Sequence, residues 1–163
     1  KLRRFVPHHI LDMNTRRRPQ WFRDDEHVFK LHAAQAKKIV EAGGKVCIGG
    51  HGQLQGLGYH WELWSVQSGG MSEMNALRCA TIFGAQAIGF EKDLGSITEG
   101  KLADLLVLDR NPLENIRNTT ALRYVMKNGL LYNADTLDQI WPVEKKLPKV
   151  YWLNDDPASR GVN

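Results

Sequence analysis

The sequence contains 163 residues and carries a net charge of +4, from 22 basic and 18 acidic side chains. A hydrophobic fraction of 42% and a charged fraction of 25% are ordinary for a globular protein, and this length allows one domain with a core of its own. No apolar run approaches the length that crosses a membrane, so we expect no membrane association.

The basic residues are concentrated in the first 23 positions, where only Asp12 is acidic: Lys1, Arg3, Arg4, Arg16, Arg17, Arg18 and Arg23. Nucleic-acid binding is one interpretation of such a cluster. The other is a solvated loop, or a surface that pairs with acidic groups of a longer protein. Because no nucleic-acid-binding fold is recognisable, nucleic-acid binding is kept only as an alternative.

The segment 1–23 has no sustained periodicity and contains Pro7 and Pro19, so we expect an irregular arm or loop. The neighbouring His8 and His9 suggest a metal site at first sight. Adjacent side chains point apart on an extended chain, however, and no further ligand pattern surrounds them. A polar surface pair is the preferred interpretation.

A helix is predicted from Asp24-Asp25 to Gly43-Gly44. Aspartate is a preferred N-cap residue, an apolar stripe follows at helical spacing, and glycine commonly ends a helix. The next residues, 45–50, are predicted to form a short apolar strand. A helix, a tight turn and a buried strand form half of a βαβ repeat, which predicts a parallel sheet.

The loop 49–62 gathers the side chains best suited to chemistry. Its glycines allow a ligand to approach the backbone closely, and His51, His60 and Glu62 are metal-competent or acid–base groups. His60 and Glu62 diverge by about 200° on a helix but share a face in an extended turn. The alternative is a helix N-terminus, in which Glu62 complements the helix dipole and His60 packs against its neighbours.

Three further helices are expected before residue 91: one over 61–69, one capped by Ser72, and a brief one over 85–90. The stripe of Met and aliphatic residues on the second helix indicates core packing. Cys47 and Cys79 fall in a predicted strand and a predicted helix, and we expect buried thiols rather than a disulfide.

Residues 95–109 predict a short strand, a turn at Glu99-Gly100 and a second strand over 105–108. The second strand is a continuous apolar run bounded by turn signals, so we expect both of its faces to be covered.

Asn128-Gly129 lies between the apolar runs 123–127 and 130–132, which is the strongest short hairpin signal. A short helix is predicted over 134–140, and a tail beyond Pro142.

Many of these motifs stand in an order that resembles the C-terminal part of the metal-dependent amidohydrolases, the imidazolonepropionase and dihydroorotase-like group. They span roughly residues 40–135 and are Met71-Ser72, Asn75-Ala76-Leu77, Ala80-Thr81, Gly84-Ala85, Ile88-Gly89, Gly95-Ser96-Ile97, Gly100-Lys101, Ala103-Asp104-Leu105, Leu108-Asp109, Asn111-Pro112-Leu113-Glu114-Asn115-Ile116 and Val125-Met126-Lys127-Asn128-Gly129.

The resemblance implies an α/β fold class: the C-terminal segment of a (β/α)8 amidohydrolase barrel plus part of the adjoining β-sandwich. A complete barrel needs about 250 residues, so the chain would be a piece of one. We expect the last barrel unit or units, with the irregular arm, in residues 1–90, the β-sandwich strands in 91–135 and a C-terminal tail in 136–163.

The resemblance also implies a site. Typical members carry an Asp at the end of the last barrel strand, where it binds metal and takes a proton from the attacking water, and His51 stands at that position here. The pattern His-Gly-Gln…Gly-Leu-Gly-x-His-x-Glu is similar to a subgroup often fused to a TolB-type β-propeller. It implies His51 as catalytic base or metal ligand, and Gln53, His60 and Glu62 as substrate-binding residues.

The other ligands of the family, including the His-x-His pair of its first strand, do not occur in this sequence. A catalytic zinc site takes three protein ligands plus water. The resemblance therefore implies a divalent metal, zinc by preference, in the parent protein. This chain would supply only one side of the metal site, which we call one wall of it. Catalysis by the isolated chain is not expected unless the missing segments come from another chain.

The leading functional interpretation is a metal-dependent hydrolase that acts on a non-peptide or cyclic-amide C–N bond of a small-molecule substrate. The competing interpretation is a non-catalytic structural module that forms homo-oligomers, because a cut barrel leaves sheet edges and apolar faces exposed. A nucleic-acid-binding arm is the third.

Overall fold

The computed structural model describes residues 2–15, 23–51, 54, 56–150 and 152. Its elements follow in the order α1 Leu2–Phe5, α2 His8–Thr15, η1 Asp24–Glu26, α3 Phe29–Glu41, α4 Leu57–Gln67, α5 Glu73–Cys79, α6 Ile82–Ala87, β1 Leu105–Leu108, η2 Ile116–Thr120, β2 Leu122–Lys127, β3 Leu130–Asn133 and β4 Gln139–Trp141.

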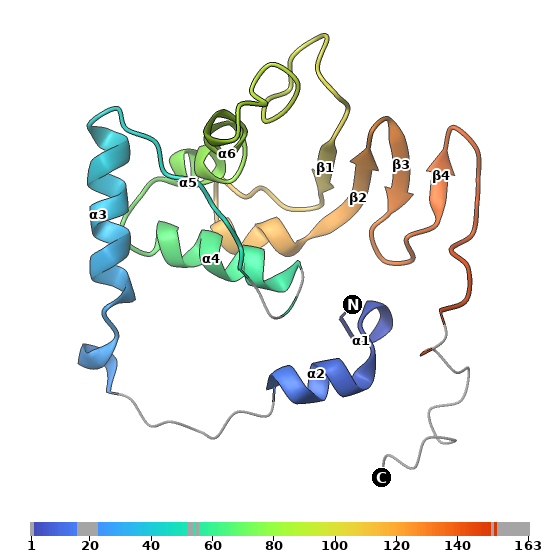
Figure 1. Ribbon diagram of the computed structural model, residues 1–163, viewed down its shortest axis with the longest axis horizontal. Helices are drawn as coiled ribbons and strands as arrows, with labels where there is room; N and C mark the ends of the chain where they lie inside the picture. The colour runs from blue at the N-terminus through green and yellow to red at the C-terminus, as the bar shows by residue number, and fades with distance from the viewer. Residues whose placement is uncertain (1, 16–22, 52–53, 55, 151, 153–163) are drawn as a thin grey trace.

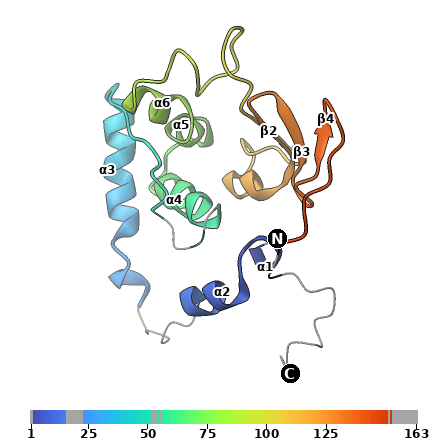
Figure 2. The same cartoon turned by 45° about the vertical axis from the view of Figure 1, so that its right-hand side comes forward.

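The chain forms a helical half and a sheet half (Figure 1). Helices α3 to α6 make up the first half, the four strands make up the second, and η2 contacts both α4 and β1. Helices α1 and α2 lie apart from α3 in both ribbon views (Figure 2). The indole N–H of Trp152 donates to the carbonyl oxygen of Arg4 at 3.1 Å, which joins α1 to the far end of the described chain.

The core lies where α4 and α5 meet η2. It is a cluster of Leu63, Met71, Ala76, Cys79 and Ile116, each no more than 5% exposed. Burying a Leu, Ile or Met side chain stabilises a fold by about 1.5–3 kcal/mol. This small cluster therefore holds the helical half against the segment that leads into the sheet.

Two predicted helix ends are confirmed. The N–H groups of Gly43 and Gly44 donate to the carbonyl oxygens of Val40 and Ile39 at 3.0 and 2.8 Å, which closes α3 where the glycine pair predicted. The Ser72 hydroxyl accepts from the Asn75 N–H at 3.3 Å and caps α5.

Two predicted helix starts are wrong. Helix α3 begins at Phe29, and Asp24 and Asp25 belong to the separate turn η1. Helix α4 begins at Leu57 and not at residue 61. Segment 1–23 also differs from the predicted irregular arm, because α1 and α2 occupy much of it. Arg16, Arg17 and Arg18 of the basic cluster lie outside the described residues.

The sheet is an antiparallel meander in the order β1-β2-β3-β4. The predicted hairpin is confirmed: Lys127 pairs with Leu130, and the two turn residues Asn128 and Gly129 have φ of +48° and +79°. Positive φ at both positions is what a two-residue hairpin loop requires. The turn at Glu99-Gly100 is confirmed as well.

The predicted strand over 45–50 is wrong for this chain. The segment forms no strand, and the Ile48 N–H donates to the Cys79 carbonyl oxygen at 3.2 Å. A barrel strand exists only between neighbouring strands, and the part of the chain that the structure describes places none beside it. The parallel sheet expected from this segment is therefore not formed by the described residues.

The predicted burial of β1 is also wrong. Leu106 is 60% exposed and Val107 is 44% exposed. Because consecutive side chains of a strand point to opposite faces, neither face of β1 is covered by the described residues, and β2 is its one partner strand among them. The short strand expected in 95–98 is not formed either.

The helix predicted over 134–140 is absent, and β4 (Gln139–Trp141) pairs with β3 there. The Asn133 side chain accepts from the N–H groups of Asp135 and Thr136 at 2.8 and 3.1 Å. This Asx turn competes with helix formation and returns the chain to the sheet. No described helix is long and apolar enough to span a membrane.

A close contact at Gly69 yields the first prediction. A Cβ atom on Gly69 would lie 2.2 Å from the carbonyl carbon of Ala33 in α3. Gly69→Ala must push α3 away from the end of α4, and we expect a loss of about 1–3 kcal/mol in the free energy of unfolding. Urea denaturation followed by circular dichroism measures it.

The matched control is Gly49→Ala, since a Cβ there meets nothing within 4 Å. It should change stability by no more than about 0.5 kcal/mol. Equal losses in the two variants would contradict the proposed contact between α3 and the turn after α4.

Candidate functional site

The predicted site residues fall in the segment 45–51 and at the start of α4. Glu62, in the second turn of α4, turns its carboxylate toward this segment. One oxygen accepts from the Gly49 N–H at 3.2 Å, and the other accepts a short hydrogen bond from the Gly50 N–H. The residue that follows this pair of amides is His51, which is exposed.

Tyr59 packs beside the same loop. Its hydroxyl donates a short hydrogen bond to the carbonyl oxygen of Ala80, and a Cβ atom on Gly50 would come within 3.3 Å of the Tyr59 Cα. Burial, followed by the negative charge of Glu62, raises the pKa of Tyr59. Tyr59 therefore stays protonated and serves as a donor that fixes the start of α4 to the end of α5.

His60 faces the other way and contacts η2. Its Nδ1 lies 3.1 Å from the Thr119 hydroxyl, which itself donates to the Ile116 carbonyl oxygen at 2.8 Å. The Trp64 indole N–H donates to the same hydroxyl at 3.2 Å. Because the hydroxyl proton is used on Ile116, we assign the proton of neutral His60 to Nδ1, as a donor to Thr119. We call His60, Trp64, Ile116 and Thr119 the Thr119 cluster.

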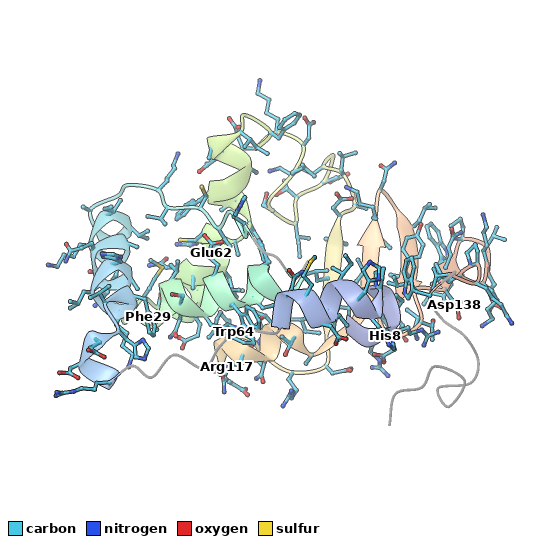
Figure 3. The ribbon with its side chains drawn as sticks, turned by 60° about the horizontal axis from the view of Figure 1, so that its bottom comes forward. His8, Phe29, Glu62, Trp64, Arg117 and Asp138 are labelled. Atoms are coloured by element: carbon cyan, nitrogen blue, oxygen red, sulfur yellow. The ribbon has the colours of Figure 1, made fainter. Side chains whose placement is uncertain are left out.

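Arg117 extends this cluster. Its guanidinium lies 4.6 Å from the centroid of the Trp64 ring, a cation–π arrangement. Figure 3 shows Trp64 and Arg117 together below α4 and Glu62 on the opposite side of that helix. Two residues on one helix therefore serve two purposes: Glu62 binds the loop before α4, and Trp64 binds η2 after β1.

An open cavity of about 700 Å³ lies between α4 to α6 and the start of the sheet. Its apolar lining includes Leu77, Ile88, Leu94, Leu102, Leu105 and Leu108, and its polar groups include Tyr59, His60, Asp104 and Thr119. Volumes of 300–1,000 Å³ are typical of ligand pockets. Two members of the Thr119 cluster, His60 and Thr119, are part of its lining.

The structure gives the four predicted site residues different surroundings. His51 is exposed beside the amides that Glu62 binds, while the ring of His60 contacts the Thr119 cluster. Gln53 lies outside the described residues. No group of three His, Cys, Asp or Glu side chains that could hold a metal ion occurs among the residues the structure describes.

Sequence reasoning did not identify Tyr59, Trp64 or Thr119 as partners of these residues. A buried indole N–H needs an acceptor, so Trp64 carried a signal. Its acceptor lies 55 positions away in the sequence, and no local pattern identifies it. Of the two thiols expected to be buried, Cys79 is buried and Cys47 is exposed, because the strand predicted around Cys47 is not formed.

The environment of His60 predicts a pH effect on stability. Burial lowers the pKa of His60, so the unfolded chain takes up this proton at a higher pH than the folded chain. The stability that neutral His60 contributes is complete above its unfolded pKa of about 6.5 and is lost as the pH falls toward the lower folded value. His60→Gln removes this loss.

The measurement is the urea midpoint at about pH 8, above the unfolded pKa of His60, and at about pH 5.5, below it. At the lower pH the unfolded chain binds the His60 proton more readily than the folded chain does, which lowers stability. We expect a smaller drop for His60→Gln than for the unmodified protein. His32→Gln, on the exposed face of α3, should drop as the unmodified protein does. Identical drops in all three proteins would contradict the assigned role of His60 burial.

Comparison with known proteins places these features in a family. The profile of the amidohydrolase family matches residues 23–131. An ochratoxinase of Aspergillus niger is 34% identical over 75 residues, which are 44% of this chain and 16% of that protein. A 5'-deoxyadenosine deaminase of Methanobrevibacter smithii is 34% identical over 67 residues, 40% of this chain and 15% of that protein.

Among solved structures, a Xaa-Pro dipeptidase with methionine bound in its active site superposes with a TM-score of 0.55 at 35% identity, covering 63% of this chain and 25% of that one. The chain thus spans about a sixth of the length of the curated relatives it matches. The prediction of an α/β segment of an amidohydrolase barrel protein is confirmed. With its family profile extending over more than half of its residues, the chain belongs to the amidohydrolase family.

Proposed function

We propose that the protein carrying this chain is a metal-dependent hydrolase that cleaves C–N bonds, of the non-peptide or cyclic-amide kind, in small amide-like substrates. Family membership supports the hydrolysis of a C–N bond, as does a relative named as a deaminase. The observation that carries the proposal is the position of His51, which is exposed directly after two backbone amides that bind the Glu62 carboxylate.

In this proposal the chain contributes one wall of the site, and His51 is its reactive group. A neutral imidazole can accept a proton from the water that attacks the amide carbon, or serve as a metal ligand. Direct contacts of Gln53, His60 and Glu62 with substrate remain predictions. His60 and Glu62 already have partners inside the chain, in Thr119 and in the Gly49 and Gly50 amides.

The described residues do not fit a complete metal site. Both oxygens of Glu62 accept hydrogen bonds from backbone N–H groups, and Nδ1 of His60 contacts Thr119. Among the described residues, His51 belongs to no group of three side chains that could bind one metal ion. A divalent ion, zinc in our proposal, would therefore need ligands from outside them. This supports the proposal that the isolated chain is inactive and that the remaining ligands come from elsewhere in the whole protein.

We also propose that the parts of the chain have separate origins in the whole protein: residues 1–90 from the end of the barrel, 91–135 from a β-sandwich, and 136–163 as a tail. The pairing of β4 (Gln139–Trp141) with β3 ties the start of the third part to the sheet.

The exposed apolar surface supports self-association of the isolated chain, as the non-catalytic interpretation requires. Ile97 is 90% exposed, and Leu106 and Val107 are exposed on the edge strand β1. Unpaired apolar edges are sites of association. A homo-oligomer would cover them with a second copy of the chain.

Light scattering after size-exclusion chromatography tests this assembly. We expect the isolated chain to be larger than a monomer, and Leu106→Lys to shift it toward the monomer because a charge on the edge strand opposes pairing. Val143→Lys, at a residue 66% exposed beyond β4, is the matched control and should leave the mass unchanged. A monomeric unmodified chain would contradict the proposal.

The catalytic proposal is tested with cyclic amides as substrates. In the whole protein, His51→Ala should lower kcat/KM by about 100-fold or more, the usual contribution of an acid–base residue. His32→Ala, on exposed α3, should leave it unchanged. The isolated 163-residue chain should show neither turnover nor stoichiometric metal in elemental analysis, and either one would contradict its proposed role as a single wall.

A further inference from the structure

We propose that Glu62 is a positioning residue: from its place on α4 it binds the backbone of Gly49 and Gly50 and so determines where His51 is presented. This inference deepens the proposed function and rests on the role of His51 given there. It differs from the substrate contact predicted from the sequence, because here Glu62 acts on the reaction only through the loop.

The first argument is the geometry of the carboxylate. Its two oxygens accept from two consecutive backbone N–H groups, one at 3.2 Å from Gly49 and the other in a short bond from Gly50. Hydrogen bonds to an ionised carboxylate are about twice as strong as neutral ones. Two of them on adjacent peptide units fix both position and orientation of the backbone, which one bond could not do.

The second argument is that no other hydrogen bond orients these two amides within the described part of the chain. Residues 45–50 form no strand, so no sheet ladder orients them in the described chain. The Ile48 N–H has its own bond to Cys79. Between that bond and His51, the described structure supplies hydrogen bonds to the backbone N–H groups of Gly49 and Gly50 only through Glu62.

We call the pair of hydrogen bonds from Gly49 and Gly50 to Glu62 the clamp. The third argument concerns the residues that this clamp requires. Gly50 has a φ of +42°, and a Cβ atom there would lie 3.3 Å from atoms of Tyr59. Tyr59 in turn is fixed by its hydroxyl to the Ala80 carbonyl oxygen. A glycine at position 50 lets the backbone lie against α4 closely enough for Glu62 to reach it, and Tyr59 keeps that end of α4 in place.

The chemistry of Glu62 follows from these contacts. Both carboxylate oxygens carry a backbone donor, so the side chain is engaged before any substrate arrives. A glutamine in its place keeps one acceptor oxygen and turns a second donor toward an N–H group. Glu62→Gln should therefore lose one of the two bonds and leave the other weakened, while Glu62→Ala loses both.

Amide hydrogen exchange in the 163-residue chain, read by NMR at Gly49 and Gly50, tests the clamp without any activity assay. We expect exchange at both glycines to be about tenfold faster or more in Glu62→Ala, as the loss of a charged hydrogen bond implies, and an intermediate change in Glu62→Gln. Exchange in the core, at Cys79, should not change. The clamp is refuted by unchanged exchange at both glycines.

A pair of glutamine variants separates a carboxylate clamp from general support of the helices. Glu73→Gln is the matched control: Glu73 lies at the start of α5 and accepts from the Gln67 side chain at 3.1 Å. It should leave the exchange rates of the Gly49 and Gly50 amides unchanged, whereas Glu62→Gln should raise them. If Glu62→Ala fails to fold, this comparison of the two glutamine variants decides the question.

The link to His51 has its own readout. Release of the loop should shift the His51 ring resonances in Glu62→Gln and, in the whole protein, lower kcat by about tenfold or more while KM changes little. An effect on KM alone would instead support direct substrate binding by Glu62 and overturn the positioning role. If the clamp is present but His51→Ala retains activity, the proposed function fails while the clamp stands.

Discussion

The hydroxyl of Thr119 holds the two halves of this chain together. It donates to the Ile116 carbonyl oxygen inside η2 and lies within hydrogen-bond distance of the Trp64 indole and the His60 ring on α4. Thr119 is 6% exposed, so a lost partner would leave a buried polar group without compensation, which is costly. The helical half and the sheet half depend on this buried set of hydrogen bonds and on the apolar core around Leu63.

Helix α4 connects the hydrogen bonds of Thr119 to the candidate site. Trp64 faces η2, and Glu62 lies on the opposite side of α4 (Figure 3). His60 contacts Thr119 of η2, and Glu62 binds the backbone amides that precede His51. A displacement of α4 relative to η2 would therefore also displace the loop. The open cavity and the edge strand β1 leave apolar surface exposed beside this helix. A chain that spans a quarter of a related solved structure has such surfaces.

The parts of the fold that sequence reasoning predicted correctly are those with local causes. Asn128-Gly129 specifies its hairpin through backbone conformations that few residues adopt, and Ser72 caps α5 through a bond three residues away. The incorrect predictions concern segments whose structure depends on distant neighbours. Residues 45–50 resemble a strand but have no partner strand among the described residues, and the Leu105–Leu108 strand is apolar but lies at an edge.

The candidate site shows the same limit. The residue types were predictable, because His51, His60 and Glu62 stand out in a glycine-rich loop. Their orientations were not, because the helix that begins at Leu57 sends Glu62 to the loop and His60 to a threonine 59 positions away. The family resemblance predicted the reaction class, whereas the hydrogen-bond partners of His60 and Glu62 follow only from the three-dimensional structure.

The meander also has a consequence for how the chain folds. Each strand pairs with its neighbour in sequence, and the β2–β3 hairpin is built from contacts of short range, which form quickly and at a small cost in loop-closure entropy. The contacts between α4 and η2 join residues more than fifty positions apart. During refolding, the β2–β3 hairpin should therefore form before α4 docks on η2.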